Sequence, residues 1–213
     1  MRIYLDLDCL TKLVAFGLFE EAMEMLGTDD VHVIDTFRFK CERMRQKAVK
    51  KNELEKADTY GKSMELLASF HVVEATPEEM ELVEQLKRTS IDDGEALLLI
   101  KLSMDGEPSR LLATGDSRFI AALGNATGLP PVFENCKGRI LSLNRLLARL
   151  IAHMGYKAVF DRMTTPLSQS MDGVVRMAFR PDSTEKSTMD YLYGFSPGNE
   201  YSAPGDPPNE WPR

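Results

Sequence analysis

Short apolar runs alternate along most of the chain with longer segments in which apolar residues recur every three or four positions. The short runs are typical of buried strands, and the recurring pattern is typical of amphipathic helices. The predicted strands cover residues 3–7, 31–34, 70–73, 111–114 and 132–133. The predicted helices cover residues 10–27, 36–48, 53–69, 77–88, 96–104, 117–123 and 140–154. This alternation predicts an α/β fold, a three-layer sandwich in which helices flank a central, mostly parallel sheet.

The pattern weakens toward the C-terminus, where the composition also changes. Seven of the eleven prolines follow residue 160, and the last residues are rich in Pro, Gly and Asn. Such composition favours turns and coil over regular elements. We therefore predict a compact domain over residues 1–158 and an irregular, Pro-rich C-terminal extension over residues 159–213.

The charge of the chain is unevenly distributed. The 213 residues include 26 Lys and Arg against 33 Asp and Glu, a net charge of −7, which disfavours binding nucleic acid through bulk charge. Residues 38–51, however, hold seven basic residues and a single acid, Glu42. Arg38 and Arg45 share the helix face of Glu42 and are candidate contacts to substrate phosphates. A solvated helix face paired with nearby acids is the structural alternative.

The cysteines and histidines give no sign of a disulfide framework or a metal site. Three scattered cysteines are typical of a protein from a reducing compartment, so we expect a cytoplasmic location. The longest apolar run, residues 13–19, is too short to span a bilayer, and we expect no membrane partner. His32, His71 and His153 lie far apart without ligand spacing, and we interpret them as core or surface residues.

Carboxylates follow two of the predicted strands. Asp6 and Asp8 end the first strand, and Asp116 follows the fourth strand across Gly115. In an open α/β sheet, ligands bind in the crevice beyond the carboxyl ends of the strands. We therefore expect these carboxylates to meet at one edge of the sheet. Capping of the helix that starts at residue 117 is the alternative role of Asp116.

Two helices are expected to add carboxylates to the same cleft. Glu95 lies in the first turn of an apolar helix, and Glu42 lies beside the buried stripe of the second helix. Several carboxylates in one cleft repel each other unless a divalent cation neutralises them, and all-oxygen ligation selects Mg²⁺ or Mn²⁺. Each glutamate also has a structural interpretation, Glu95 as a complement to the helix dipole and Glu42 as a solvated helix residue.

In four short motifs the sequence resembles the PIN-domain family of metal-dependent nucleases, over about residues 2–150. The motifs are Tyr4 to Asp8, Thr36 with Glu42, Asp93 to Ala96, and Thr114 to Asp116. The resemblance implies a PIN-like fold and the following site residues. The catalytic acids would be Asp6, Glu42, Glu95 and Asp116, the metal ligands would include Asp6, Asp8, Glu95 and Asp116, and Thr114 would be the hydroxyl on the substrate side. Asp8 stands where the family usually has Asn, and Glu95 where Asp is commoner.

The resemblance also implies an activity and partners. The activity would be endoribonuclease cleavage of RNA with Mg²⁺ or Mn²⁺, leaving 5′-phosphate and 3′-hydroxyl ends. The family includes the ribonuclease toxins of bacterial toxin–antitoxin modules. The expected partners are therefore RNA, an antitoxin protein and a second copy of the chain, with which it would form a homodimer.

Two other functions compete with the nuclease. Asp6-Leu7-Asp8 and Gly115-Asp116-Ser117 resemble the motifs of haloacid dehalogenase-like phosphotransferases, in which Asp6 would be the nucleophile and Asp8 the general acid. That family has a threonine where this chain has Leu10 and an acid where it has Ile120. The second alternative is a PIN-like domain that binds RNA or protein without catalysis.

Overall fold

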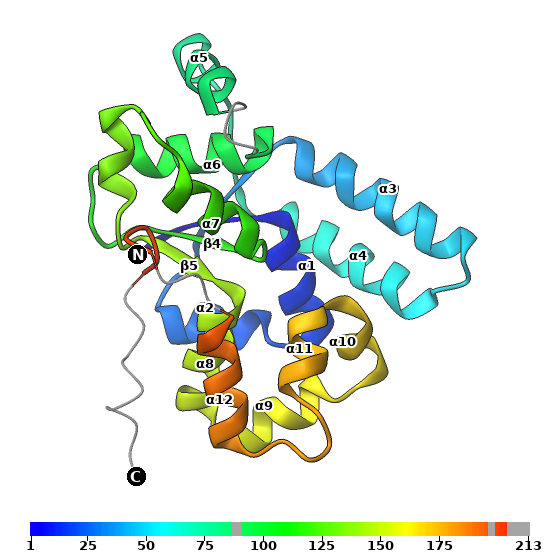
Figure 1. Cartoon of the computed structure of the whole chain (residues 1–213). Helices are drawn as coiled ribbons and strands as arrows, with labels where there is room; N and C mark the ends of the chain where they lie inside the picture. The colour runs from blue at the N-terminus through cyan, green and yellow to red at the C-terminus, as the bar shows by residue number, and fades with distance from the viewer. Residues whose placement is uncertain (87–90, 196–198, 204–213) are drawn as a thin grey trace.

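A five-stranded parallel sheet forms the centre of the molecule (Figure 1). The computed structural model describes residues 1–86, 91–195 and 199–203. In chain order the strands are β1 (Arg2–Leu5), β2 (Asp30–Ile34), β3 (His71–Val73), β4 (Leu111–Thr114) and β5 (Ile140–Ser142). They are arranged in the order β3-β2-β1-β4-β5, and every pair is parallel. The predicted α/β class with a parallel sheet is therefore confirmed.

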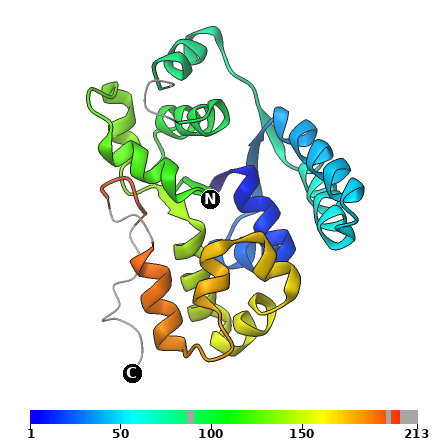
Figure 2. The ribbon, with the colours of Figure 1, turned by 45° about the vertical axis from the view of Figure 1, so that its right-hand side comes forward.

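Helices cover both faces of the sheet, and their apolar sides form one core with it. The helices of the α/β part are α1 (Leu7–Phe16), α2 (Phe19–Leu26), α3 (Thr36–Lys50), α4 (Leu54–Leu67), α5 (Pro77–Leu86), α6 (Asp93–Met104), α7 (Ser117–Asn125) and α8 (Leu143–Met154). Helix α6 packs against the central strands on one face, whereas α1 and α8 pack on the other. Helices α3 and α4 pair as a hairpin that projects away from the sheet in both views (Figures 1 and 2).

Two predicted elements were wrong because short apolar runs do not distinguish strand from helix. Residues 132–133, predicted as a strand, lie in a 3-10 helix, η2 (Pro131–Cys136). The fifth strand is instead formed by residues that were assigned to the start of a helix. The side chain of Ser142 accepts a hydrogen bond from Arg145 N and so begins α8 directly after that strand. The predicted helix 10–27 is also two helices, because Gly17 adopts a left-handed conformation with φ of 62°.

The C-terminal extension is helical, and its predicted irregular structure is wrong for the described residues. It contains α9 (Tyr156–Met163), α10 (Pro166–Met171), α11 (Gly173–Ala178) and α12 (Glu185–Gly194). The predicted boundary at residue 158 lies inside α9. Buried side chains of these helices, among them Val159 and Leu192, belong to the same hydrophobic core as the sheet. Both views show the helices grouped beside α1 and α8 (Figures 1 and 2).

Short polar caps explain how a Pro-rich segment forms helices. Thr165, Asp172 and Thr184 each accept hydrogen bonds from the first turn of the helix that follows. Pro166 lies at the first helical position, where proline favours a helix because no hydrogen bond is lost. Four of the seven late prolines lie in residues 204–213, outside the described residues, as do the predicted last residues of helix 77–88.

Residues 199–203 cover the outer edge of β5. Ile140 N donates to the carbonyl oxygen of Tyr201 at 3.0 Å, and Ala203 N donates to that of Ile140 at 2.7 Å. None of the described helices is long and apolar enough to cross a lipid bilayer. All three cysteines are free and buried.

Candidate functional site

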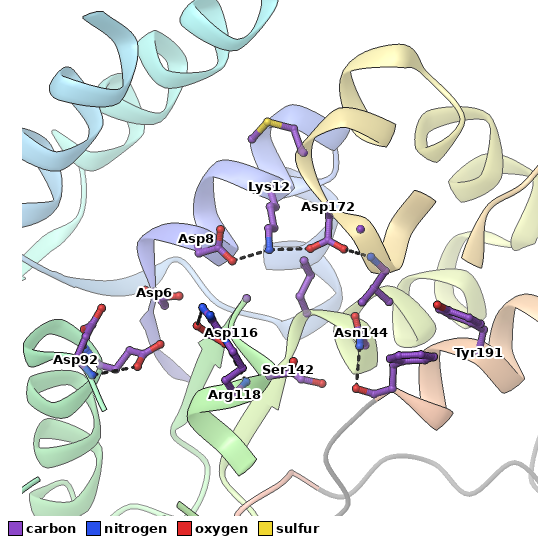
Figure 3. Close-up of a pocket in the computed structure, with 18 residues that line it drawn as sticks. Asp6, Asp8, Lys12, Asp92, Asp116, Arg118, Ser142, Asn144, Asp172 and Tyr191 are labelled. Atoms are coloured by element: carbon purple, nitrogen blue, oxygen red, sulfur yellow. Dashed lines mark hydrogen bonds and ion pairs between the residues drawn. The ribbon is translucent and has the colours of Figure 1, made fainter. Parts of the chain in front are cut away.

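An acidic pocket of about 730 Å³ opens at the carboxyl ends of β1, β4 and β5 (Figure 3). Five of its carboxylates come from the α/β part of the chain, and a sixth comes from the start of α11. They belong to Asp6, Asp8, Asp92, Glu95, Asp116 and Asp172. The structure thus brings Asp6, Asp8, Glu95 and Asp116 to one edge of the sheet, as the sequence predicts.

Asp6 lies deepest among these carboxylates. It follows β1 directly, and its backbone N–H donates to the carbonyl oxygen of Ala113 at 2.9 Å, which continues the pairing of β1 with β4. Thr114 Oγ1 donates to Asp6 Oδ2 at 3.3 Å and accepts from Asp116 N at 3.1 Å. Only 9% of Asp6 is exposed. Burial, and then the charges of Asp8 and Asp92, raise the pKa of Asp6 to about 6.

Glu95 has two roles at the start of α6. Its backbone N–H donates to Asp92 Oδ1 at 2.8 Å, and Glu95 Oε2 accepts from Asp92 N at 3.4 Å, so the two residues form a capping box. Burial, and then the charges of Asp92, Asp6 and Asp116, raise the pKa of Glu95 to about 8. Glu95 therefore has a structural role in the capping box, which was not predicted from the sequence, and the same side chain also belongs to the carboxylate cluster.

Two basic side chains pair with three other carboxylates of the pocket, those of Asp8, Asp116 and Asp172. Lys12 Nζ lies 2.6 Å from Asp8 Oδ2 and 2.7 Å from Asp172 Oδ2 (Figure 3). Burial alone would lower the pKa of Lys12, but these two charges raise it well above its ordinary value. Arg118 Nη2 contacts Asp116 Oδ2 at 2.6 Å, and its side chain is 90% exposed. The bonds from Arg118 lower the pKa of Asp116 despite partial burial.

Four charged residues of this pocket were not predicted from the sequence as site residues: Lys12, Asp92, Arg118 and Asp172. Lys12 follows Asp8 by one helical turn, so the spacing of i and i+4 could have indicated that pair. Asp172 could not be found, because its contact with Lys12 depends on how the C-terminal helices pack.

Gly115 brings the backbone close to the pocket carboxylates. A Cβ atom at this position would overlap Asp8 Oδ2 and would lie 3.1 Å from Cys9 N. A glycine at this position allows such a close approach because it has no side chain. The group that it approaches here is the carboxylate of Asp8.

Glu42 does not line the pocket. It lies on α3, where its carboxylate accepts from Gln46 Nε2 at 2.8 Å and from Arg45 Nη1 at 3.5 Å. Arg38 and Arg45 are exposed on the same helix. The structure therefore keeps Glu42 with basic and polar neighbours of its own helix and does not bring it to the other three acids.

The pocket offers carboxylate oxygens, the type of ligand that Mg²⁺ and Mn²⁺ prefer. Among the described residues, no ion pair joins a basic side chain to Asp6, Asp92 or Glu95, which leaves three carboxyl groups of the pocket without a neutralising charge. No three described carboxylates of the pocket place their oxygens within 4.8 Å of one another. Mg²⁺ commonly keeps several water ligands and is held directly by one or two carboxylates, so binding it would not require three of these oxygens to converge.

Comparisons of the chain with known protein families, with curated proteins and with solved structures found no match. The resemblance to PIN domains therefore remains a prediction from the four sequence motifs. Function has to be inferred from the chemistry of the pocket.

Proposed function

We propose that the chain is an endonuclease that hydrolyses phosphodiester bonds of single-stranded RNA at the acidic pocket and requires Mg²⁺ or Mn²⁺. The observation that carries this proposal is the cluster of Asp6, Asp92, Glu95 and Asp116, in which burial and mutual repulsion raise the pKa of Asp6 and of Glu95. Such a cluster repels a polyanionic substrate unless a cation is present.

The residues of the pocket have separable roles in this proposal. The chemistry that Mg²⁺ or Mn²⁺ supplies when bound is activation of water and neutralisation of charge on the scissile phosphate. Asp6 and Asp116 would hold the ion, and Glu95 would hold it or a water molecule beside it. Thr114 orients Asp6 through its hydroxyl. Arg118 is exposed and bonded to Asp116, so it can exchange that carboxylate for a substrate phosphate.

The opposite wall of the pocket favours an unpaired nucleotide as the substrate. Tyr191 and Phe195 of the C-terminal segment line it, with their rings stacked at a centroid distance of 4.4 Å and an angle of 22°. Asn144 Nδ2 donates to the carbonyl oxygen of Phe195 at 3.3 Å and fixes that end of the pair. Phe195 is 54% exposed, so a ring face is accessible to a base. Aromatic rings that stack on splayed bases are typical of sites for single strands.

The test is cleavage of an end-labelled single-stranded RNA by the full chain with Mg²⁺, with Mn²⁺ and with EDTA. We expect cleavage only with a divalent cation, with 5′-phosphate and 3′-hydroxyl ends. The Asp116→Asn variant should still bind the RNA and should not cut it. Cleavage that continues in EDTA, or that Asp116→Asn leaves unchanged, would exclude the proposed site. RNA binding without cleavage in the wild-type chain would favour a non-catalytic binding domain.

The phosphotransferase alternative retains one favourable observation, because Asp6, Asp8 and Asp116 all line the pocket. Two contacts oppose it. Asp8 pairs with Lys12 at 2.6 Å instead of facing a leaving group, and Asp6 is buried where a nucleophile needs access. A stable aspartyl phosphate on Asp6 after incubation with a phosphomonoester would support this alternative over the nuclease.

A further inference from the structure

A second group of potential ligands lies on the sheet, away from the acidic pocket. Asp30 begins β2, and His32 follows it two residues later, so both side chains point to the same face. The parallel register places His71, the first residue of β3, beside His32. Their rings stack at 4.9 Å with an angle of 27°. Residues far apart in the sequence therefore form a compact cluster near the amino ends of two strands, whereas the pocket lies beyond the carboxyl ends.

The donor atoms of this cluster converge. His32 Nε2 lies 2.6 Å from Asp30 Oδ1, His71 Nε2 lies 3.7 Å from the same oxygen, and the three donor atoms lie within 4.8 Å of one another. We propose that Asp30, His32 and His71 bind a late first-row divalent metal ion, with Zn²⁺ as the best match, and leave a fourth position for water. This proposal is independent of the nuclease activity.

The arrangement around the cluster directs the donor atoms toward one point. Arg2 Nε bonds to Asp30 Oδ2 at 3.1 Å, which leaves Oδ1 to face the two imidazoles. His32 is 9% exposed, and none of the described residues bonds to its buried Nδ1, so Nε2 is the nitrogen that contacts Asp30. Arg2 also contacts Asp105, which offsets its positive charge. A bound ion would replace the short hydrogen bond between Asp30 and His32.

The ligand types select the class of metal. Two imidazoles and one carboxylate suit Zn²⁺ and its neighbours, whereas Mg²⁺ prefers oxygen ligands alone. The cysteine thiols do not compete, because all three are buried and burial raises the pKa of each. The site would join β3, a three-residue strand at the edge of the sheet, to β2. Metal binding should therefore stabilise the folded chain.

The test is titration of the metal-free, full-length chain with Zn²⁺ by calorimetry and with Co²⁺ by visible absorption. We expect the wild-type chain to bind Zn²⁺ with its highest affinity at this cluster, with one ion per chain, and to melt at a higher temperature when Zn²⁺ is present. His71→Gln should weaken this binding by about 100-fold or more, since even the loss of residues that only orient ligands costs about 10- to 100-fold. The same variant should lose the rise in melting temperature and the strong visible absorption of tetrahedral Co²⁺.

Two variants serve as controls. His153→Gln removes the remaining histidine, which is exposed on α8, and should leave Zn²⁺ binding unchanged. Glu95→Gln alters the acidic pocket and should also leave it unchanged. Because the side chain of His71 is 68% exposed, its replacement should preserve the fold, which the circular dichroism spectrum checks. Equal Zn²⁺ affinity in the wild type and His71→Gln, or loss of binding in Glu95→Gln, would overturn the proposal.

Discussion

The acidic pocket and the basic helix α3 both contain residues that the sequence assigned to one site. The structure brings the residues of the pocket together but leaves Glu42 on α3 outside it. Asp6 and Asp116 meet because their strands are neighbours in the sheet, although they lie far apart in the sequence. Glu42 lies two turns into a helix whose orientation depends on its packing against α4. A residue at a strand end is placed by the sheet, whereas a residue on a projecting hairpin is placed by contacts that the sequence pattern does not specify.

The two regions also differ in the electrostatic state of the same kind of side chain. In the pocket, burial and neighbouring acids raise the pKa of Glu95 to about 8. On α3, the carboxylate of Glu42 is partly exposed and bonds to Arg45 and Gln46. A carboxylate that has lost water and faces like charges is suited to bind a cation. A solvated carboxylate that already bonds to a basic neighbour gains less from binding a cation.

The largest expected effect comes from comparing Asp6→Asn with Glu42→Gln. Under the proposed function, Asp6→Asn should reduce RNA cleavage by about 10³-fold, since a loss of roughly 4 kcal/mol of transition-state stabilisation corresponds to that factor. Glu42→Gln should keep cleavage within about threefold of the wild type, because Glu42 does not line the pocket. The measurement is the initial rate on end-labelled single-stranded RNA with saturating Mg²⁺.

The stability of each variant controls this comparison. Asp6→Asn removes one of several like charges, so its melting temperature without metal should not fall. Equal losses of activity in both variants, with both folded, would return Glu42 to the site and would mean that α3 approaches the pocket when substrate binds. Full activity in Asp6→Asn would remove the pocket from the mechanism.

The convergence of the strand ends could be predicted from the sequence, and the C-terminal wall of the pocket could not. The alternation of apolar segments predicts the parallel sheet. Because ligands bind at the carboxyl edge of such a sheet, Asp6, Asp8 and Asp116 could be predicted as neighbours there. Asp172 and Tyr191 lie in a segment with weak periodicity, and their positions depend on the packing of α11 and α12. His32 and His71 were missed because strand register, not sequence spacing, makes them neighbours.

Two pocket carboxyl groups should make the metal-free protein less stable as the pH rises, whereas His32, whose pKa is lowered by burial, contributes in the opposite direction below about pH 6.5. The pKa values of Asp6, about 6, and of Glu95, about 8, lie above their ordinary values of 3.8 and 4.5. Between its ordinary pKa and its raised pKa, each group binds more protons in the folded chain than in the unfolded chain. These two groups should therefore reduce the stability of the metal-free protein as the pH rises from about 4 to 8. For Asp6 alone the shift corresponds to about 3 kcal/mol.

Chemical denaturation at several pH values in EDTA would measure this dependence. Glu95→Gln should make the decline shallower, and Mg²⁺ should restore stability most at the high end of the range. The pKa of Asp116 is lowered, so its contribution is lost only as the pH falls below about 4 and does not mask the decline. Stability that rises from about pH 5 to 8 in the metal-free protein would contradict the carboxylate cluster.

A smaller effect should follow from removing the aromatic wall. Phe195→Ala should weaken binding of a single-stranded RNA by about tenfold, since stacking of one base on an aromatic ring contributes about 1 to 3 kcal/mol. Phe39→Ala is the control, because Phe39 is an aromatic residue on α3 that is 77% exposed, more than Phe195. Fluorescence anisotropy in an Asp116→Asn background measures the affinity while the RNA survives. A loss of affinity in Phe39→Ala with none in Phe195→Ala would place the bases along α3 instead of at the pocket.

The smallest expected effect tests the basic surface of α3. If Arg38 and Arg45 contact substrate phosphates, replacing both with alanine should reduce the slope of log affinity against log salt by about 1.4, since each phosphate contact with a single strand contributes roughly 0.7. The loss should not depend on base sequence, and metal affinity should stay the same, because a guanidinium does not ligate cations. The double variant Lys157→Ala and Lys186→Ala, on the C-terminal helices, controls for the change in net charge.

In the structure Arg45 bonds to Glu42, so a phosphate contact requires Arg45 to leave that carboxylate. An unchanged slope would make α3 a solvated face or a protein-binding surface, and Arg118 beside Asp116 would then be the basic residue that meets the phosphate.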